Sequence, residues 1–254
     1  MAPEKPESKA KSYFTTHASF YTSSPAHTDE SNLLRIKELA QAQPHWMMLD
    51  IATGTGHTAS AFSPQVKSVV ALDLTPAMME EGRGNIVVSD SIYWACGDAH
   101  ALPFAENTFD AVSCRRAYHH FSDPGHALHE IRRVLKPGGR FILDDRSVPE
   151  DEEVDRFMNQ LDLWHDPSHV RQYPLSDWRK MLSDAGFRVD HLEGYTRKRP
   201  LSALTTTAAP EDAVKIESTM ERISPHLKAV LKVEKQEDEI FHRHWYVVGI
   251  AVLT

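Results

Sequence analysis

Short apolar runs alternate with helical segments through the middle of the chain. Consecutive apolar positions predict five buried strands, at 46–51, 68–73, 92–97, 109–114 and 140–145. Helix start signals fall in the gaps between these runs, at His57, Pro76 and Pro124. The last of these helices is expected to end at Pro137-Gly138-Gly139. Strands that alternate with helices predict right-handed βαβ units and a mainly parallel sheet.

The two flanks of this alternation have weaker patterns. Residues 1–12 are charged and contain prolines, which predicts a disordered tail. A helix capped by Asp29 or Ser31 follows and should end before Pro44. The remaining predicted elements are helices over 151–164, from Ser176 to Ala185 and near 211–223, and strands over 187–193 and 244–253.

Length and charge limit the classes of protein that fit. A chain of 254 residues suits one α/β domain with a cap. The net charge is −8, whereas nucleic-acid binders usually carry a basic surface, so we expect no nucleic-acid partner. No apolar run is long enough for a membrane span, and the N-terminus lacks the apolar core of a signal peptide. We therefore expect a cytoplasmic protein, either a monomer or a homodimer.

Cysteine and histidine spacing does not indicate a metal site. Cys96 and Cys114 form no CxxC pair and are expected to be small core residues on strands. The chain has 15 histidines but no HExxH motif, so most of them are predicted to lie on the surface.

A glycine-containing loop separates the first predicted strand from its helix. Residues 53–56 read Thr53-Gly54-Thr55-Gly56, and a helix begins directly after them. Glycines let the backbone approach a ligand, and the helix N-terminus presents free N–H groups to a carboxylate or phosphate. Because the loop also fits the GxGxxA form of the dinucleotide fingerprint, it does not choose between a dinucleotide and another nucleoside.

Three acids at successive strand ends narrow this choice. Asp73 ends the second strand, where a carboxylate can accept hydrogen bonds from a ribose diol. Asp50 precedes the glycine loop, where it would repel a pyrophosphate and favour a cationic ligand. Asp98 follows the third strand, at a position suited to an adenine amine. Together they favour a ligand that combines a nucleoside with a positive charge.

At this point the chain resembles the class I S-adenosylmethionine-dependent methyltransferases, in particular the group of the ubiquinone/menaquinone C-methyltransferases. The resemblance runs through LDIATGTGH (49–57), VVALDLTPAMME (69–80), GDAHALPFAENTFDAV (97–112) and HEIRRVLKPGGRFIL (129–143). It implies an α/β fold: a Rossmann-like, doubly wound, seven-stranded and mostly parallel sheet with an antiparallel last strand. The first glycine of the usual DxGxGxG is Ala52 here.

The resemblance also implies S-adenosyl-L-methionine as cofactor and assigns its contacts. Gly54 and Gly56 would face the methionine part, Asp73 the ribose, Leu74 the adenine ring, and Asp98 with Ala99 the adenine amine. The backbone of Arg115 would meet the methionine end. The full expected set is Asp50, Thr53, Gly54, Gly56, Asp73, Leu74, Met78, Asp98, Ala99 and Arg115.

The expected domain is a single unit over 13–254, with two variable segments around the cofactor. In similar enzymes the segment 13–43, which contains Tyr13 and Tyr21, folds over the cofactor as a lid, although these aromatics could equally anchor the first helix. The insert at about 146–175 would cover the acceptor.

The loop after the fourth strand carries the candidate catalytic residues Tyr118, His119 and His120. Histidine titrates near neutral pH and suits a general base, while Tyr118 could orient an acceptor. His57 could touch the cofactor or only begin its helix. The loop lacks the Asn/Asp-Pro-Pro-aromatic motif of amino-methylating nucleic-acid enzymes, and neither cysteine follows a proline as ring methylation of cytosine requires. Both absences favour a small-molecule acceptor, which could be methylated at oxygen, nitrogen or carbon.

Three other functions remain open at this point. An enzyme of cyclase or isomerase type would keep the cofactor and transfer no methyl group. A nicotinamide-dependent oxidoreductase would use the same glycine loop, although Asp50 and Asp98 count against it. An RNA methyltransferase would need salt-dependent RNA binding, which the acidic balance disfavours.

Overall fold

One sheet organises the molecule in the computed structural model, which describes residues 6–24, 27–85 and 89–254. Its strand order is β3-β2-β1-β4-β5-β8-β6, with β7 paired to β8. The strands are β1 (Met47–Ile51), β2 (Ser68–Asp73), β3 (Ile92–Cys96), β4 (Phe109–Arg115), β5 (Leu135–Ser147), β6 (Phe187–Pro200), β7 (Glu234–Gln236) and β8 (Glu239–Leu253). β1 to β5 run parallel, and β8 pairs antiparallel with β5, β6 and β7. The predicted fold class is confirmed, and β7 adds an unpredicted eighth strand.

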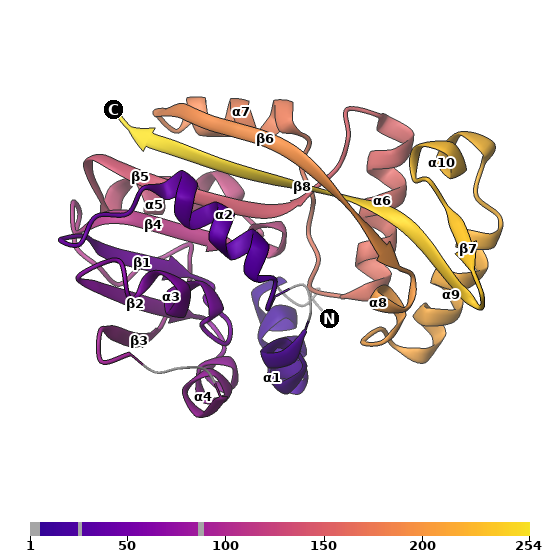
Figure 1. The fold of residues 1–254 in the computed structure, drawn as a ribbon, viewed down its shortest axis with the longest axis horizontal. Coiled ribbons are helices and arrows are strands. Elements are labelled where there is room, and N and C mark those ends of the chain that lie inside the picture. Colours follow the sequence, from indigo (N-terminus) through magenta and orange to yellow (C-terminus); the bar gives the residue numbers. More distant parts are fainter. Residues whose placement is uncertain (1–5, 25–26, 86–88) are drawn as a thin grey trace, which may run out of the picture.

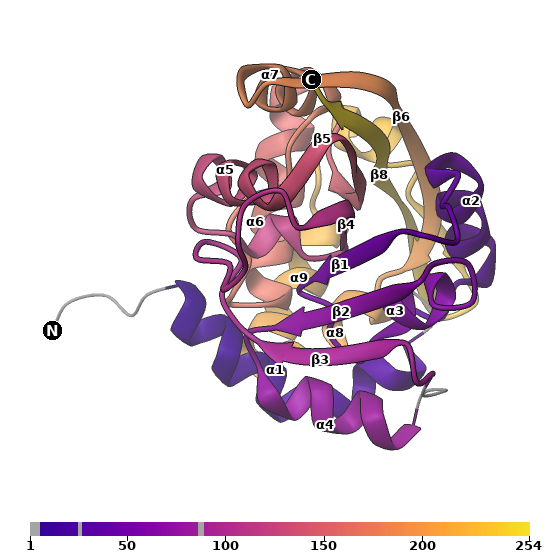
Figure 2. The same ribbon diagram turned by 90° about the vertical axis from the view of Figure 1, so that its left-hand side faces the viewer.

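Helices cover both faces of the sheet, as Figure 2 shows. On one face α2 (Glu30–Ala40) and α3 (His57–Phe62) bury Ile36 and Phe62 against β1 and β2. On the other, α5 (Pro124–Val134) and α7 (Leu175–Asp184) bury Ile131 and Trp178 against β4 and β5. α4 (Pro76–Asn85) follows β2. Two apolar layers therefore hold the strand ends rigidly, and these ends carry the predicted cofactor residues.

A second core lies beyond the carboxyl end of the sheet. The long strands β6 and β8 stay paired with each other and extend past the end of β5. There they reach a group of helices on the right of Figure 1. This group consists of α6 (Glu152–His165), α8 (Ser202–Thr205), α9 (Pro210–Glu221) and α10 (Pro225–Val230). Its members bury Met158, Leu204, Ile216 and Leu231 against one another. The polar region 196–235, for which the sequence predicts one helix, thus holds three helices and part of the sheet.

The N-terminal segment corrects one expectation. Residues 6–12, predicted to be disordered, form the first turns of α1 (Pro6–Ser23), while residues 1–5 lie outside the described part of the chain. α1 buries Tyr13 and Ala18, and Thr22 donates to Glu81 on α4. Tertiary packing of this aromatic side therefore extends the helix into a sequence that looks polar and unstructured.

Several smaller predictions also need correction. Pro174 takes the N-cap position expected of Ser176, and Lys136 to Gly139 lie within β5 instead of ending a helix. Cys114 is buried as predicted, but Cys96 is exposed. The prediction that most histidines lie on the surface fails for a buried group consisting of His119, His165, His169, His242 and His244.

The described residues contain no helix long and apolar enough to cross a membrane. Among the same residues, no group of three or more histidine, cysteine or acidic side chains could hold a metal ion.

Candidate active site

The loop after β1 turns sharply in the left-handed backbone region. Ala52, Gly54 and Gly56 have φ angles of 50°, 59° and 90°. A Cβ on Gly56 would lie 2.6 Å from the Trp94 ring, so only glycine fits there. Gly56 is itself buried against Trp94, away from the cavity that the loop lines. The sequence prediction of a tight glycine turn is confirmed, while Gly56 shapes the loop from behind and Gly54 faces the cavity.

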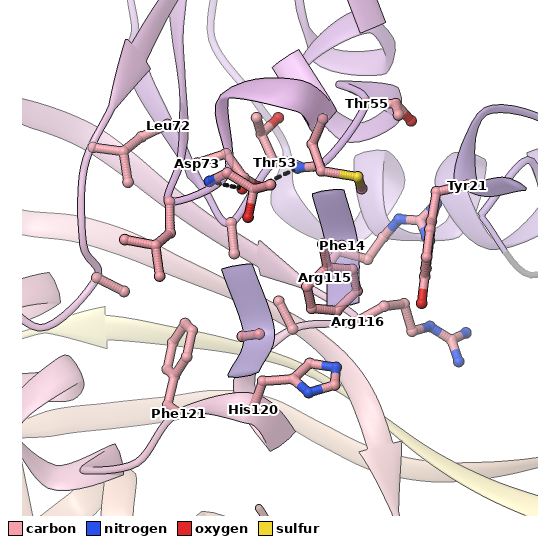
Figure 3. Close-up of a pocket in the computed structure, with 18 of the residues that line it drawn as sticks. Phe14, Tyr21, Thr53, Thr55, Leu72, Asp73, Arg115, Arg116, His120 and Phe121 are labelled. Atoms are coloured by element: carbon pink, nitrogen blue, oxygen red, sulfur yellow. Dashed lines mark hydrogen bonds between the residues drawn. The ribbon is translucent and has the colours of Figure 1, made fainter. Parts of the chain in front are cut away.

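Asp73 joins this loop to the end of β2. Its carboxylate accepts hydrogen bonds from the Gly54 N–H at 2.7 Å and from the Thr75 N–H at 2.8 Å, as the dashed lines in Figure 3 mark. Burial raises the pKa of this carboxyl group, and the hydrogen bonds oppose the rise. Both oxygens have remaining lone pairs, so Asp73 can also accept from hydroxyl groups of a ligand in the cavity that it lines.

Asp50 lies behind the loop, away from the cavity surface. Its oxygens accept from Ser113 Oγ at 2.5 Å and Thr53 Oγ1 at 2.6 Å. Burial raises the pKa of this carboxyl to about 6. Asp50 does not line the cavity, so the direct contact with a cationic ligand that the sequence predicts is not available to it. Asp50 instead ties the glycine loop to β4.

The cavity above the loop brings together most of the expected cofactor residues. Predicted residues among its lining are Thr53, Gly54, Asp73, Leu74, Met78, Asp98, Ala99 and Arg115. Asp98 Oδ1 accepts from the His100 N–H at 2.8 Å, which orients the Asp98 carboxylate. His57 begins α3 and also lines the cavity. We refer to this space as the cofactor cavity.

Arg115 contributes a buried guanidinium with unused donors. Its Nη2 donates to the His27 carbonyl at 2.5 Å, and its Nε has no partner among the described residues. No ion pair joins Arg115 to a carboxylate within that part of the chain, and burial lowers its pKa. A buried cation without an anion is costly. The site therefore suits a carboxylate, such as that of a methionine moiety.

A second, larger cavity of about 430 Å³ opens beside the first. Its lining comes from α1, the loop after β4, β5, α6, β6, α8 and β8, and we refer to it as the acceptor cavity. Five of its side chains are basic: Arg116, Arg146, Arg197, Lys198 and Arg199. Only Arg146 and the residues from 162 to 169 belong to the insert predicted to cover the acceptor. Tyr21, His119 and His120 were also singled out by the sequence, whereas no sequence pattern marks the basic residues of β6, which lie far away along the chain.

The two cavities meet. The residues that line both are Phe14, Tyr21, His27, Arg116 and His120. In Figure 3, His120 and Phe121 lie on the opposite side of the cofactor cavity from Asp73. Phe14 and Tyr21 come from α1, so this helix forms part of the wall of both spaces. The expected lid position of Tyr21 is consistent with this placement, whereas Tyr13 donates to Thr207.

His119 is paired with a buried carboxylate. The imidazole Nδ1 lies 2.5 Å from Asp145 Oδ1, and the His119 N–H donates to Asp145 Oδ2 at 3.0 Å. Burial lowers the pKa of His119, so the ring is neutral and donates through Nδ1–H. Its Nε2 is then a proton acceptor on the side of the acceptor cavity, which His119 lines.

His120 has its tautomer set by a different partner. Ser168 Oγ donates to Asp166 Oδ1 at 2.6 Å and lies 3.0 Å from His120 Nδ1. Because the serine hydroxyl has one hydrogen, it accepts at His120, which must donate through Nδ1–H. His120 Nε2 lies at the junction of the two cavities, 3.9 Å from Asp166 Oδ2.

Tyr118 does not take the role proposed from the sequence. Its ring is fully buried beside Trp178, and its hydroxyl donates to the Pro124 carbonyl. It lines neither cavity. The short 3-10 turn Tyr118–His120 sends the tyrosine into the core and the two histidines toward the acceptor cavity, a difference in side-chain direction that loop position alone does not reveal.

Known proteins are similar to this chain in sequence and in fold. A family model described as a methyltransferase domain matches residues 49–143. The uncharacterized methyltransferase YcgJ of Bacillus subtilis is 38% identical over 172 residues, which cover 67% of this chain and 68% of the relative. A ubiquinone/menaquinone biosynthesis C-methyltransferase of Roseobacter denitrificans is 34% identical over 163 residues, with 55% and 65% covered.

Two solved structures extend the similarity to nearly the whole fold. A candidate methyltransferase of Bacillus halodurans superposes with a TM-score of 0.83 and 31% identity, over 88% of this chain and 100% of that one. The YcgJ structure gives a TM-score of 0.81 and 29% identity, over 88% and 98%. The chain therefore belongs to the class I S-adenosylmethionine-dependent methyltransferases.

Proposed function

We propose that this protein transfers a methyl group from S-adenosylmethionine to a small molecule that binds in the acceptor cavity. The observation that carries the proposal is the junction, where Phe14, Tyr21, His27, Arg116 and His120 line both cavities. Methyl transfer requires donor and acceptor to meet in line with water excluded, and two joined cavities under one helix meet that requirement.

The residues of the cofactor cavity fit the cofactor. Asp73 has free lone pairs for ribose hydroxyls, Arg115 has free donors for a carboxylate, and Gly54 leaves room for close approach. When bound, S-adenosylmethionine supplies an electrophilic methyl group on a sulfonium, whose loss leaves a neutral thioether.

His120 is the residue that we place beside the reacting acceptor atom. Its Nε2 accepts the proton that a hydroxyl or amine acceptor loses as the new bond to carbon forms. Ser168 lies at the other ring nitrogen, and the nearby Asp166 carboxylate, 3.9 Å from Nε2, can stabilise the imidazolium that forms. His119 lines only the acceptor cavity, and its pairing with Asp145 fits a supporting role, in which it orients the acceptor by accepting a hydrogen bond.

Calorimetry and mass spectrometry together test the proposal. Titration with S-adenosylmethionine should show one binding site, and incubation with a library of hydroxyl and amine compounds should give products heavier by one methyl group. Absence of S-adenosylmethionine binding would contradict the proposal. A product of unchanged mass would instead assign the protein to the cyclase or isomerase type.

A further inference from the structure

The acceptor cavity has an unusual balance of charge for a protein of net charge −8. Five basic side chains line it, against the three carboxylates of Asp29, Asp162 and Asp166. Asp29 pairs with Arg197 and Asp162 with Arg146, while Asp166 accepts from Ser168. Its acids are therefore already satisfied by protein groups.

The basic side chains differ in whether a carboxylate neutralises them. Four of them form ion pairs, in the combinations Arg116–Asp144, Arg146–Asp162, Arg197–Asp29 and Lys198–Glu234. Arg199 is different, because within the described part of the chain it pairs with no carboxylate. Its Nη1 donates to the Tyr246 hydroxyl at 3.1 Å. Arg199 thus brings an uncompensated positive charge to the cavity wall.

Tyr246 reports the local electrostatic potential at that wall. Burial alone would raise the pKa of this phenol, yet its pKa lies below the usual value because guanidinium groups surround it. These groups are Arg199, Arg116, whose guanidinium carbon lies 3.9 Å from the ring centroid, and Arg146. The phenol pKa of Tyr195, which stacks on Tyr246, is raised instead. Tyr195 does not line the cavity, and its pKa is raised by burial and by Asp144, whereas the positive field of the guanidinium groups acts on Tyr246 at the cavity wall.

The remaining lining indicates the body of the ligand. Phe14, Phe20 and Tyr21 project from α1 into the same cavity, and Phe14 and Tyr21 also reach the junction. Arg199 and Tyr246 line the acceptor cavity alone. An anion bound to them occupies a part of the acceptor cavity that the cofactor cavity does not share, while an aromatic ring can extend between the α1 side chains toward His120.

We propose that the acceptor is an aromatic carboxylate whose anionic group binds Arg199 and the Tyr246 hydroxyl and whose hydroxyl or amine meets His120. The inference rests on the methyl-transfer function proposed above. A planar guanidinium with a neighbouring hydroxyl donor matches the two oxygens of a carboxylate. The cavity volume of about 430 Å³ suits a ligand of this size.

Calorimetric titration of the protein saturated with S-adenosylhomocysteine tests this inference. The probes are 4-hydroxybenzoate, its neutral amide 4-hydroxybenzamide, and 4-hydroxyphenyl phosphate. We expect the affinity for the carboxylate to be at least about tenfold higher than the affinity for the amide, because the amide cannot form the charged hydrogen bond. Tighter binding of the phosphate would move the assignment from a carboxylate to a phosphate ester and so contradict it.

Three variants locate the effect. Arg199→Gln should remove the preference for carboxylate over amide, and Arg199→Lys should retain part of it. Arg188→Gln is the matched control, because Arg188 lies on the same strand, is exposed and lines neither cavity. Thermal unfolding of each variant shows whether it folds.

Two results would overturn the inference. One is that protein that binds S-adenosylhomocysteine normally binds the carboxylate and the amide equally, or binds neither. The proposed methyl transfer would still stand in that case. The other is an unchanged carboxylate preference in folded Arg199→Gln. Failure to bind S-adenosylhomocysteine in the first place would instead contradict the proposed function.

Discussion

The cofactor cavity and the acceptor cavity are built in different ways. The cofactor cavity consists mainly of loops at strand ends, where backbone groups and two acids come from residues close together in sequence. The acceptor cavity is lined by long charged side chains from several separate elements and by a helix from the N-terminus. The cofactor cavity is rigid because two apolar cores hold β1, β2 and β4. The acceptor cavity depends on ion pairs and histidines between the sheet and the group of helices α6, α8, α9 and α10.

This contrast explains how one fold can serve different acceptors. The cofactor contacts depend on strand ends that the sheet fixes, so they stay in place while the distant elements change. Each half should therefore respond separately to substitution, except at the side chains that both cavities share.

The largest effect is expected on turnover from His120→Ala. Removal of a general base typically lowers kcat by about 10²- to 10⁴-fold, and affinity for S-adenosylmethionine, whose cavity His120 also lines, should fall much less than turnover. Turnover is measured with the acceptor found by the library screen, and cofactor affinity by calorimetry. His45→Ala, which changes an exposed histidine, is the control. Unchanged turnover in His120→Ala would remove this residue from the reaction.

Asp73→Ala should produce the reverse pattern. Loss of a charged acceptor for ribose hydroxyls, together with the bonds to Gly54 and Thr75, should weaken S-adenosylmethionine binding by about 10- to 100-fold. Binding of the acceptor probe 4-hydroxybenzoate, titrated alone, should be nearly unaffected. Asp90→Ala removes an exposed acid and serves as the control. Equal losses for both ligands would mean that the two halves are not independent.

Acid should destabilise the folded protein through the buried histidines around the acceptor cavity. Burial lowers the pKa of His165, His169 and His242 to about 4. The unfolded chain therefore takes up protons between pH 6.5 and 4 that the folded chain rejects. The contribution of these histidines to stability is present in full above about pH 6.5 and falls as the pH drops. The loss amounts to about 1.4 kcal/mol for each pH unit by which the pKa of the folded chain lies below that of the unfolded chain.

Asp50 and Asp145, whose pKa burial raises to about 6, act in the opposite sense and reduce the slope. Thermal unfolding from pH 7 to pH 5 measures the net effect, with a lower midpoint expected at pH 5. His169→Gln keeps a donor for Asn159 and should flatten the profile, whereas the exposed His45→Gln should not. A midpoint that rises toward pH 5 would contradict this assignment.

The smallest effect is expected from Phe14, an apolar side chain in the wall that both cavities share. Phe14 packs against Tyr21 and His120, with ring centroids 5.3 Å and 5.2 Å apart. Phe14→Ala should lower the affinity for both S-adenosylmethionine and the acceptor probe by about two- to tenfold, since aromatic pairs contribute about 0.5–1.5 kcal/mol. Phe20→Ala is the matched comparison, because Phe20 lines only the acceptor cavity and should affect the acceptor alone. Calorimetry with each ligand distinguishes the two patterns.

The sheet could be predicted because its signals are local. Each of β1 to β5 is an apolar run, a helix start follows β1, β2 and β4, and β8 is a long apolar run. α1 is only partly predictable because its first turns are polar, while the helix gains its order from packing against α4 and the turn after β4. Strand β6 extends well past the predicted 193 because it pairs with β8, distant in sequence, as far as Pro200, and its consecutive charged residues Arg197 to Arg199 line the acceptor cavity.

The candidate site was predictable to a similar limit. Asp73 and Gly54 follow strand ends, so their position at the sheet edge can be inferred from the sequence. Asp50 and Tyr118 were misplaced, because a position in a motif does not tell whether a side chain faces the cavity or the core. Arg199 carries no sequence signal at all, since its place in one cavity with His119 and His120 depends on how β6 pairs with the outer part of β8.

A crystal structure of the protein with S-adenosylhomocysteine would decide whether the two cavities meet at the reacting sulfur. We expect adenine beside Asp98 and Ala99, ribose hydroxyls on Asp73, and the methionine carboxylate at Arg115. The sulfur should face His120 at the junction with the acceptor cavity. Density that places the sulfur away from this junction, or the ligand outside the cofactor cavity, would refute the proposed arrangement.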